Sequence, residues 1–83
     1  MDFIIKEYIN KLTEEEIKTF LNKKGINPNN EEIKVLYLYA KNYYQVFYKG
    51  NPTELLIELK EKLTPTTYNS LLLLYKEYQN KRF

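Results

Sequence analysis

The stretch from residue 30 to residue 52, NEEIKVLYLYAKNYYQVFYKGNP, decides the fold of this chain. Its apolar residues recur every three or four positions, which is the period of an α-helix. They also surround the helix on nearly all sides, and a helix of that kind is buried among others. Because the stretch ends at Gly50, it predicts one long helix over about residues 31–49 at the centre of a helical fold.

The residues before this stretch predict two shorter helices, over about residues 3–11 and 14–24. Thr13 and Glu16 have the spacing of a capping box, in which each side chain satisfies a backbone amide at the start of a helix. Gly25 follows the second helix, where a glycine can adopt a left-handed conformation. Asn29 or Asn30 then caps the long helix. The inward face of the second helix consists of Ile17, Phe20 and Leu21.

The residues after the stretch predict two more helices, over about residues 52–62 and 65–80. Asn51 and Thr64 each stand directly before a proline, and proline is favoured at the first position of a helix. The apolar positions expected to face inward are Leu55, Leu56, Leu59, Leu63, Tyr68, Leu71, Leu72 and Tyr75. No Asn-Gly or Asp-Gly turn is present to support a hairpin.

The predicted fold class is therefore all-α. We expect one domain over residues 1–83, a compact bundle of about five short helices around the tyrosine-rich third helix. The length of 83 residues leaves no room for a second independent core.

The composition excludes most active-site chemistry. The chain has neither histidine nor cysteine, so the commonest zinc ligand, the commonest general base and any thiolate are missing. Its two glycines, Gly25 and Gly50, are too far apart for a phosphate-binding loop. We predict no catalytic residue, no cofactor and no metal site, and expect that the protein is not an enzyme.

Two acidic groups have an ordinary explanation. Residues 14–16 are all glutamate, but successive helical side chains point about 100° apart, so the three carboxylates do not converge. They favour the positive end of a helix instead. Glu58 stands four residues before Lys62, as in the ion pairs of solvated helix faces.

The longest uninterrupted apolar run covers only residues 35–40, far short of the roughly 20 residues that cross a bilayer. The N-terminal residues lack the continuous apolar core of an export signal. We therefore expect a cytoplasmic protein without a membrane partner.

Tyrosine is the most informative residue type. The third predicted helix carries more aromatic surface than one small core needs, which predicts a contact surface for a protein partner or a second copy, formed by Tyr37, Lys41, Tyr44 and Tyr48. The alternative is that these rings pack inside with their hydroxyls at the rim.

The basic residues offer a second functional hypothesis. The net charge is only +2, and its one concentration is the C-terminal part with Lys76, Lys81 and Arg82. In this hypothesis these residues contact the phosphates of a single-stranded nucleic acid, and the tyrosines of the third predicted helix stack on its bases. The other interpretation is a helix end whose positive charges suit the helix dipole.

Part of the chain resembles the SAP-like and LEM-like helix-loop-helix modules, in which a capped helix ends at a glycine and leads into a second helix. The residues that carry this resemblance are Leu12, Thr13, Glu16, Ile17, Leu21, Gly25 and Ile26. It implies binding to DNA, RNA or a DNA-associated partner, although residues 27–32 lack the basic side chains that meet phosphate in such modules.

Nearly the whole chain is similar to a family of short helical proteins of Gram-positive bacteria, classed as a domain of unknown function. The residues that carry this similarity are Leu12, Thr13, Glu16, Ile17, Gly25, Ile26, Lys41, Asn42, Phe47, Leu63, Thr64, Pro65 and Thr67. It implies an all-helical fold and no particular chemistry.

Overall fold

The computed structural model describes residues 2–80, and the side chains of residues 6–77 within them. These residues form the helices α1 (Asp2–Lys11), α2 (Glu14–Lys23), α3 (Asn30–Lys49), α4 (Thr53–Lys62) and α5 (Pro65–Asn80). The described part of the chain contains no strand. The all-α prediction is confirmed, and the radius of gyration of 12.3 Å is close to the roughly 11.8 Å expected for one compact domain of this length.

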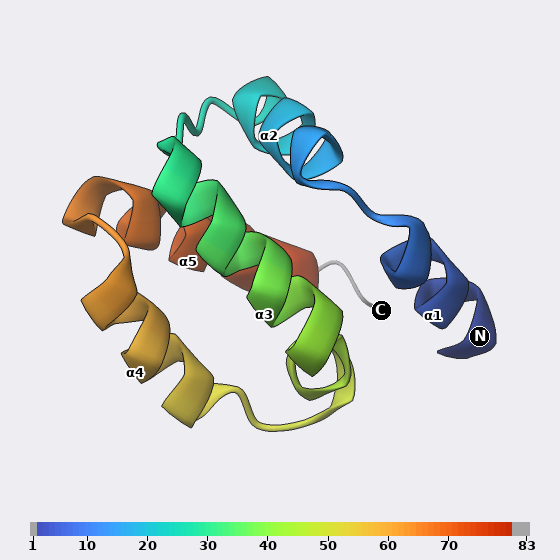
Figure 1. Cartoon of the computed structure of the whole chain (residues 1–83). Helices are drawn as coiled ribbons and strands as arrows, with labels where there is room; N and C mark the ends of the chain where they lie inside the picture. The colour runs from blue at the N-terminus through green and yellow to red at the C-terminus, as the bar shows by residue number, and fades with distance from the viewer. Residues whose placement is uncertain (1, 81–83) are drawn as a thin grey trace.

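Helix α3 runs through the middle of the molecule (Figure 1). Helices α1 and α2 contact α3, and α4 contacts α5. Helix α4 lies on the other side of α3 from α2, and α5 passes behind α3 in this view (Figure 1). The predicted central position of the tyrosine-rich helix is therefore confirmed.

The start of α2 agrees with the sequence prediction. The Thr13 hydroxyl accepts a hydrogen bond from the amide of Glu16 at 3.1 Å, and the Glu16 carboxylate accepts one from the amide of Thr13 at 3.0 Å. Gly25 follows α2 with a φ of +79°, a left-handed conformation that only glycine adopts at little cost.

Other details of α2, α3 and α4 differ from the prediction. Phe20 was expected to face inward, but it is 41% exposed and lies under the Lys24 ammonium, because α2 packs on α3 through Leu21 instead. Helix α3 has a kink at Tyr43, where φ is −129° and ψ is 18°. Helix α4 begins at Thr53, one residue later than predicted, although the Asn51 side chain still accepts from the Thr53 amide at 3.1 Å.

The first turn of α3 is joined to the start of α5 through one buried carboxylate. Glu32 is 4% exposed, and its Oε1 accepts from the amide of Asn29 at 3.0 Å, which closes a second capping box. Its Oε1 also accepts from the Thr67 hydroxyl at 3.1 Å, while its Oε2 accepts from the amide and the hydroxyl of Thr64 at 2.8 and 3.0 Å. We call Glu32, Asn29, Thr64 and Thr67 the carboxylate knot.

The carboxylate knot satisfies the exposed amides at two helix starts with one negative charge. Burial raises the pKa of the Glu32 carboxyl, but the hydrogen bonds from Asn29, Thr64 and Thr67 outweigh burial and hold that pKa below its ordinary value. Glu32 is therefore ionised in the folded protein at neutral pH. The carboxylate also suits the positive ends of both helices.

Candidate binding pocket

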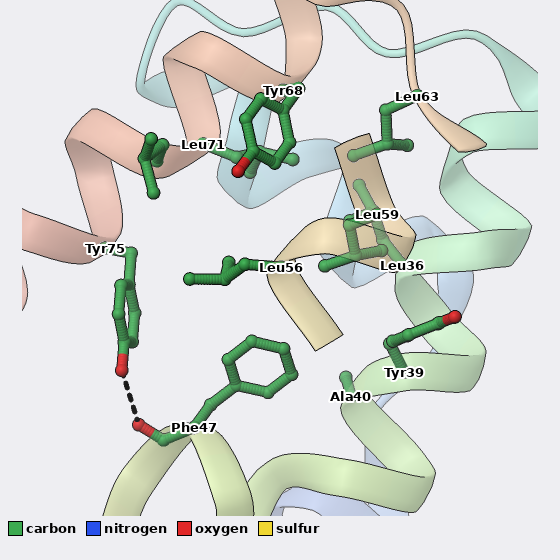
Figure 2. A pocket seen from close by; sticks show the side chains of 11 residues that line it. Leu36, Tyr39, Ala40, Phe47, Leu56, Leu59, Leu63, Tyr68, Leu71 and Tyr75 are labelled. Carbon is green, nitrogen blue, oxygen red and sulfur yellow. Dashed lines mark hydrogen bonds between the residues drawn. The ribbon is translucent and has the colours of Figure 1, made fainter. Parts of the chain in front are cut away.

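An apolar pocket of about 200 Å³ lies between α3, α4 and α5, where the inward leucines and tyrosines of the sequence predict a closed core. It is open to solvent, and Figure 2 shows the side chains around it. The lining residues are Leu36, Tyr39, Ala40, Phe47, Leu56, Leu59, Leu63, Tyr68, Leu71, Leu72 and Tyr75. Most of them were predicted to face inward, but only Leu59 and Leu63 of this set are buried.

The kink in α3 shapes one end of this pocket. Tyr39 and Ala40 come from the part of α3 before Tyr43, and Phe47 comes from the part after it. In Figure 2 the Phe47 ring lies across the end of the pocket, on a different segment of the ribbon from Ala40. The change of direction at Tyr43 therefore lets one helix supply both a side wall and an end wall.

Two of the three tyrosine hydroxyls around the pocket are held by neighbouring groups. Tyr39 donates to the Glu58 carboxylate of α4 at 2.6 Å, and this bond is the main reason that the pKa of Tyr39 is raised to about 12. Tyr75 donates to the backbone carbonyl of Phe47 at 3.3 Å, while the two rings meet edge to face at 6.1 Å. Both bonds fix ring orientations in the wall.

The hydroxyl of Tyr68 is different. It makes no hydrogen bond with any residue that the structure describes, and among those residues no buried side-chain oxygen lacks a partner, so this oxygen is accessible to solvent. In Figure 2 it points toward the space that the other side chains surround. Tyr68 therefore offers the pocket one polar group that the fold does not use.

The predicted contact surface lies on a different face of α3 from this pocket. Tyr37, Lys41, Tyr44 and Tyr48 are all half-buried. The Lys41 ammonium donates to the backbone carbonyl of Asn10 in the last turn of α1 at 2.7 Å, and it lies 5.4 Å from the centre of the Tyr37 ring. The structure thus brings Tyr37 and Lys41 together beside α1. Tyr44 accepts a long hydrogen bond of 3.4 Å from Gln45.

The predicted nucleic-acid contacts are only partly within view. Lys76 is exposed on α5, whereas Lys81 and Arg82 lie outside the described residues.

Within residues 2–80, no group of three or more acidic side chains is placed to hold a metal ion. In the same part of the chain, no helix combines the length and the apolar character that crossing a membrane requires.

Sequence reasoning missed both the pocket and the carboxylate knot. The sequence signal for the carboxylate knot was the spacing of Asn29 and Glu32, which is the same capping-box spacing as that of Thr13 and Glu16. This spacing does not tell which distant hydroxyl groups the Glu32 carboxylate contacts. Nothing in the periodicity of the leucines and tyrosines distinguishes a filled core from an open pocket.

Comparison of the chain with protein-family models, with curated proteins and with solved structures finds no match. The fold places it in the class of small single-domain all-α proteins.

Proposed function

We propose that this chain is a non-catalytic helical module that works by contact with another protein or with a second copy of itself. One observation carries the proposal. Four large apolar or aromatic side chains of α3, α4 and α5 are at least 40% exposed, namely Leu38, Tyr43, Ile57 and Leu73. A contact that covered them would remove apolar area from water.

The exposed surface includes large apolar side chains on three successive helices. Leu38 of α3 is 55% exposed, Ile57 of α4 is 56% exposed and Leu73 of α5 is 69% exposed. Single exposed residues of this kind are ordinary, but a contact that covered them would remove apolar area from water. This supports a role for the outer faces of α3, α4 and α5 in association.

The tyrosines of α3 supply the other part of the argument. Tyr37, Tyr44 and Tyr48 are half-buried, so part of each residue is accessible at the surface, and Tyr43 at the kink is 40% exposed. Tyrosine contributes large contact area at a small cost in side-chain entropy, because its ring is rigid. Leu38 and Tyr43 are the two exposed large apolar or aromatic side chains of α3, so the proposal is tested at these two positions. A cytoplasmic location belongs to the same proposal.

Sedimentation velocity over a wide range of protein concentrations tests the self-contact form of this proposal. We expect a mass above 10.1 kDa that grows with concentration. Leu38→Ser and Tyr43→Ser should weaken association while changing the free energy of unfolding by less than about 1 kcal/mol, because exposed positions contribute little to folding. Tyr8→Ser, at a 64% exposed position on α1, is the matched control and should leave association unchanged.

A chain that stays monomeric at every concentration would leave contact with another protein as the remaining form. That form is tested with a photo-reactive amino acid placed at position 43 or, as control, at position 8. A discrete cross-linked product from position 43 that Leu38→Ser removes would support the proposal. Equal cross-linking from both positions, or none from either, would contradict it.

A further inference from the structure

The pocket between α3, α4 and α5 has the size of a site for a small molecule. Its volume of about 200 Å³ exceeds that of an engineered apolar cavity of roughly 150 Å³ that binds benzene. It is smaller than the roughly 300–1,000 Å³ of pockets that hold drug-sized ligands or cofactors. One six-membered ring with a small substituent therefore fits, whereas a nucleotide or a flavin does not.

The walls of the pocket favour an aromatic ring over an aliphatic one. Phe47 and Tyr75 already meet edge to face at 6.1 Å, and Figure 2 shows these two rings and the ring of Tyr68 around one space. Aromatic rings in such edge-to-face or offset arrangements gain free energy beyond the area they bury. The leucines of α4 and α5 complete an apolar surface around the same space.

The polar atoms of the wall restrict the ligand further. The hydroxyl of Tyr39 donates a hydrogen bond to the Glu58 carboxylate, and the hydroxyl of Tyr75 donates one to the backbone carbonyl of Phe47. Tyr68 alone has a hydroxyl that points into the pocket without a partner among the described residues. A ligand with one hydrogen-bond acceptor beside its ring would use this donor, whereas further polar groups that face the apolar walls would be left unsatisfied.

We propose that this pocket binds a small monocyclic aromatic compound with one hydrogen-bond acceptor, such as a carbonyl oxygen. The ring lies against Phe47 and Tyr75, and the acceptor meets the Tyr68 hydroxyl. This site does not depend on the proposed protein contact, because it uses the inner walls of α3, α4 and α5 rather than their exposed residues.

Three probes of similar size test the proposal: acetophenone, ethylbenzene and cyclohexyl methyl ketone. Chemical-shift titration of the ¹⁵N-labelled full chain gives the dissociation constant of each. Acetophenone should bind most tightly. Ethylbenzene lacks the acceptor, so its dissociation constant should be about two- to tenfold higher, which corresponds to the net free energy of one neutral hydrogen bond. Cyclohexyl methyl ketone keeps the acceptor but lacks the aromatic ring, and it should also bind more weakly.

Two variants locate the site. Tyr68→Phe removes one oxygen and keeps the ring, so it should fold normally, bind ethylbenzene as before and lose the preference for acetophenone. Ala40→Leu adds three carbons inside the pocket and should abolish binding of all three probes without lowering the melting temperature. Leu73→Ala, at an exposed position, is the control and should bind as the wild type does.

Several results would overturn the proposal. These are no saturable shift with any probe, equal affinity for acetophenone and ethylbenzene in the wild type, or tightest binding of cyclohexyl methyl ketone. A preference for acetophenone that persists in Tyr68→Phe would overturn it as well. The Tyr68→Phe comparison stays decisive even if Ala40→Leu does not fold.

Discussion

The substitution Glu32→Gln gives the sharpest test of how the fold is held together. It preserves the size of a side chain that is 4% exposed and removes its charge. An amide can still accept on the side of Asn29 and Thr67, but its NH₂ group would then face the Thr64 amide, which is also a donor. The backbone N–H of Thr64, at a partly buried contact, therefore loses its partner.

The expected magnitude follows from these contacts. Two hydrogen bonds from Thr64 to a charged oxygen are lost, at about 1.5–3 kcal/mol each. Part of this loss is offset, because the variant no longer buries a charge and the Thr64 hydroxyl can turn to accept from the new amide. We expect a net destabilisation of about 2 kcal/mol, which lowers the melting temperature by about 8–16 °C for a domain of this size.

The matched control is Glu16→Gln. Glu16 occupies the same position in the capping box of α2, but it is exposed and bonds only to Thr13. Its replacement should cost less than about 1 kcal/mol. Urea denaturation followed by circular dichroism measures both variants. If Glu32→Gln costs no more than Glu16→Gln, the contacts with Thr64 and Thr67 add nothing to stability, and the reasoning is refuted.

The effect of pH on the same pair has a defined sign. The folded state holds the pKa of Glu32 below its ordinary value of 4.5, so the unfolded chain takes up the proton first as the pH falls. The stabilisation by Glu32 is complete above pH 4.5 and is lost as the pH falls through the lower, folded-state pKa. The difference in unfolding free energy between wild type and Glu32→Gln should therefore shrink in acid.

Three further outcomes are expected. Gly25→Ala should lower the free energy of unfolding, measured by urea denaturation, by about 1–2 kcal/mol, because φ is +79° at this position. An added Cβ would touch nothing within 4 Å, so the cost comes from the backbone conformation alone. Gly25→Asn should cost less, because asparagine tolerates the left-handed conformation better than alanine. Absorbance titration should show a tyrosine ionisation step near pH 12 that is absent from Tyr39→Phe. The stabilisation from the bond between Tyr39 and Glu58 should be complete below pH 10 and should be lost as the pH rises toward 12. The contact hypothesis predicts that fluorescence anisotropy detects no binding to labelled DNA or RNA; binding that weakens with salt and with Lys76→Gln would favour the nucleic-acid hypothesis instead.

The local features of the fold were readable from the sequence. The capping box at Thr13, the left-handed Gly25 and the long helix before Gly50 depend on residues close together in the chain. The sequence allowed either Asn29 or Asn30 as the N-cap of α3. The structure shows Asn29 as the cap, whose side chain accepts a hydrogen bond from the nearby amide of Glu32 at 2.8 Å.

The features that depend on packing were not readable. The kink of α3 occurs at Tyr43 without a proline or glycine to announce it. Thr64 and Thr67, the distant partners of Glu32, lie beyond the rest of α3 and the whole of α4 in the chain, so no spacing rule could find them. Most of the inward residues predicted for α4 and α5 do line one space, but their periodicity fixes only a direction. The distance between the helices decides whether such residues close a core or leave a pocket.

The carboxylate knot also has a consequence for the rates of folding. Caps such as that of Thr13 can form as soon as their own helix begins, whereas joining Glu32 to Thr64 closes a loop over two helices and carries an entropic cost that grows with loop length. We expect this closure to come late, after the transition state. Weakening the knot should then speed unfolding and leave the folding rate nearly unchanged, so the lifetime of the native state depends on a single carboxylate.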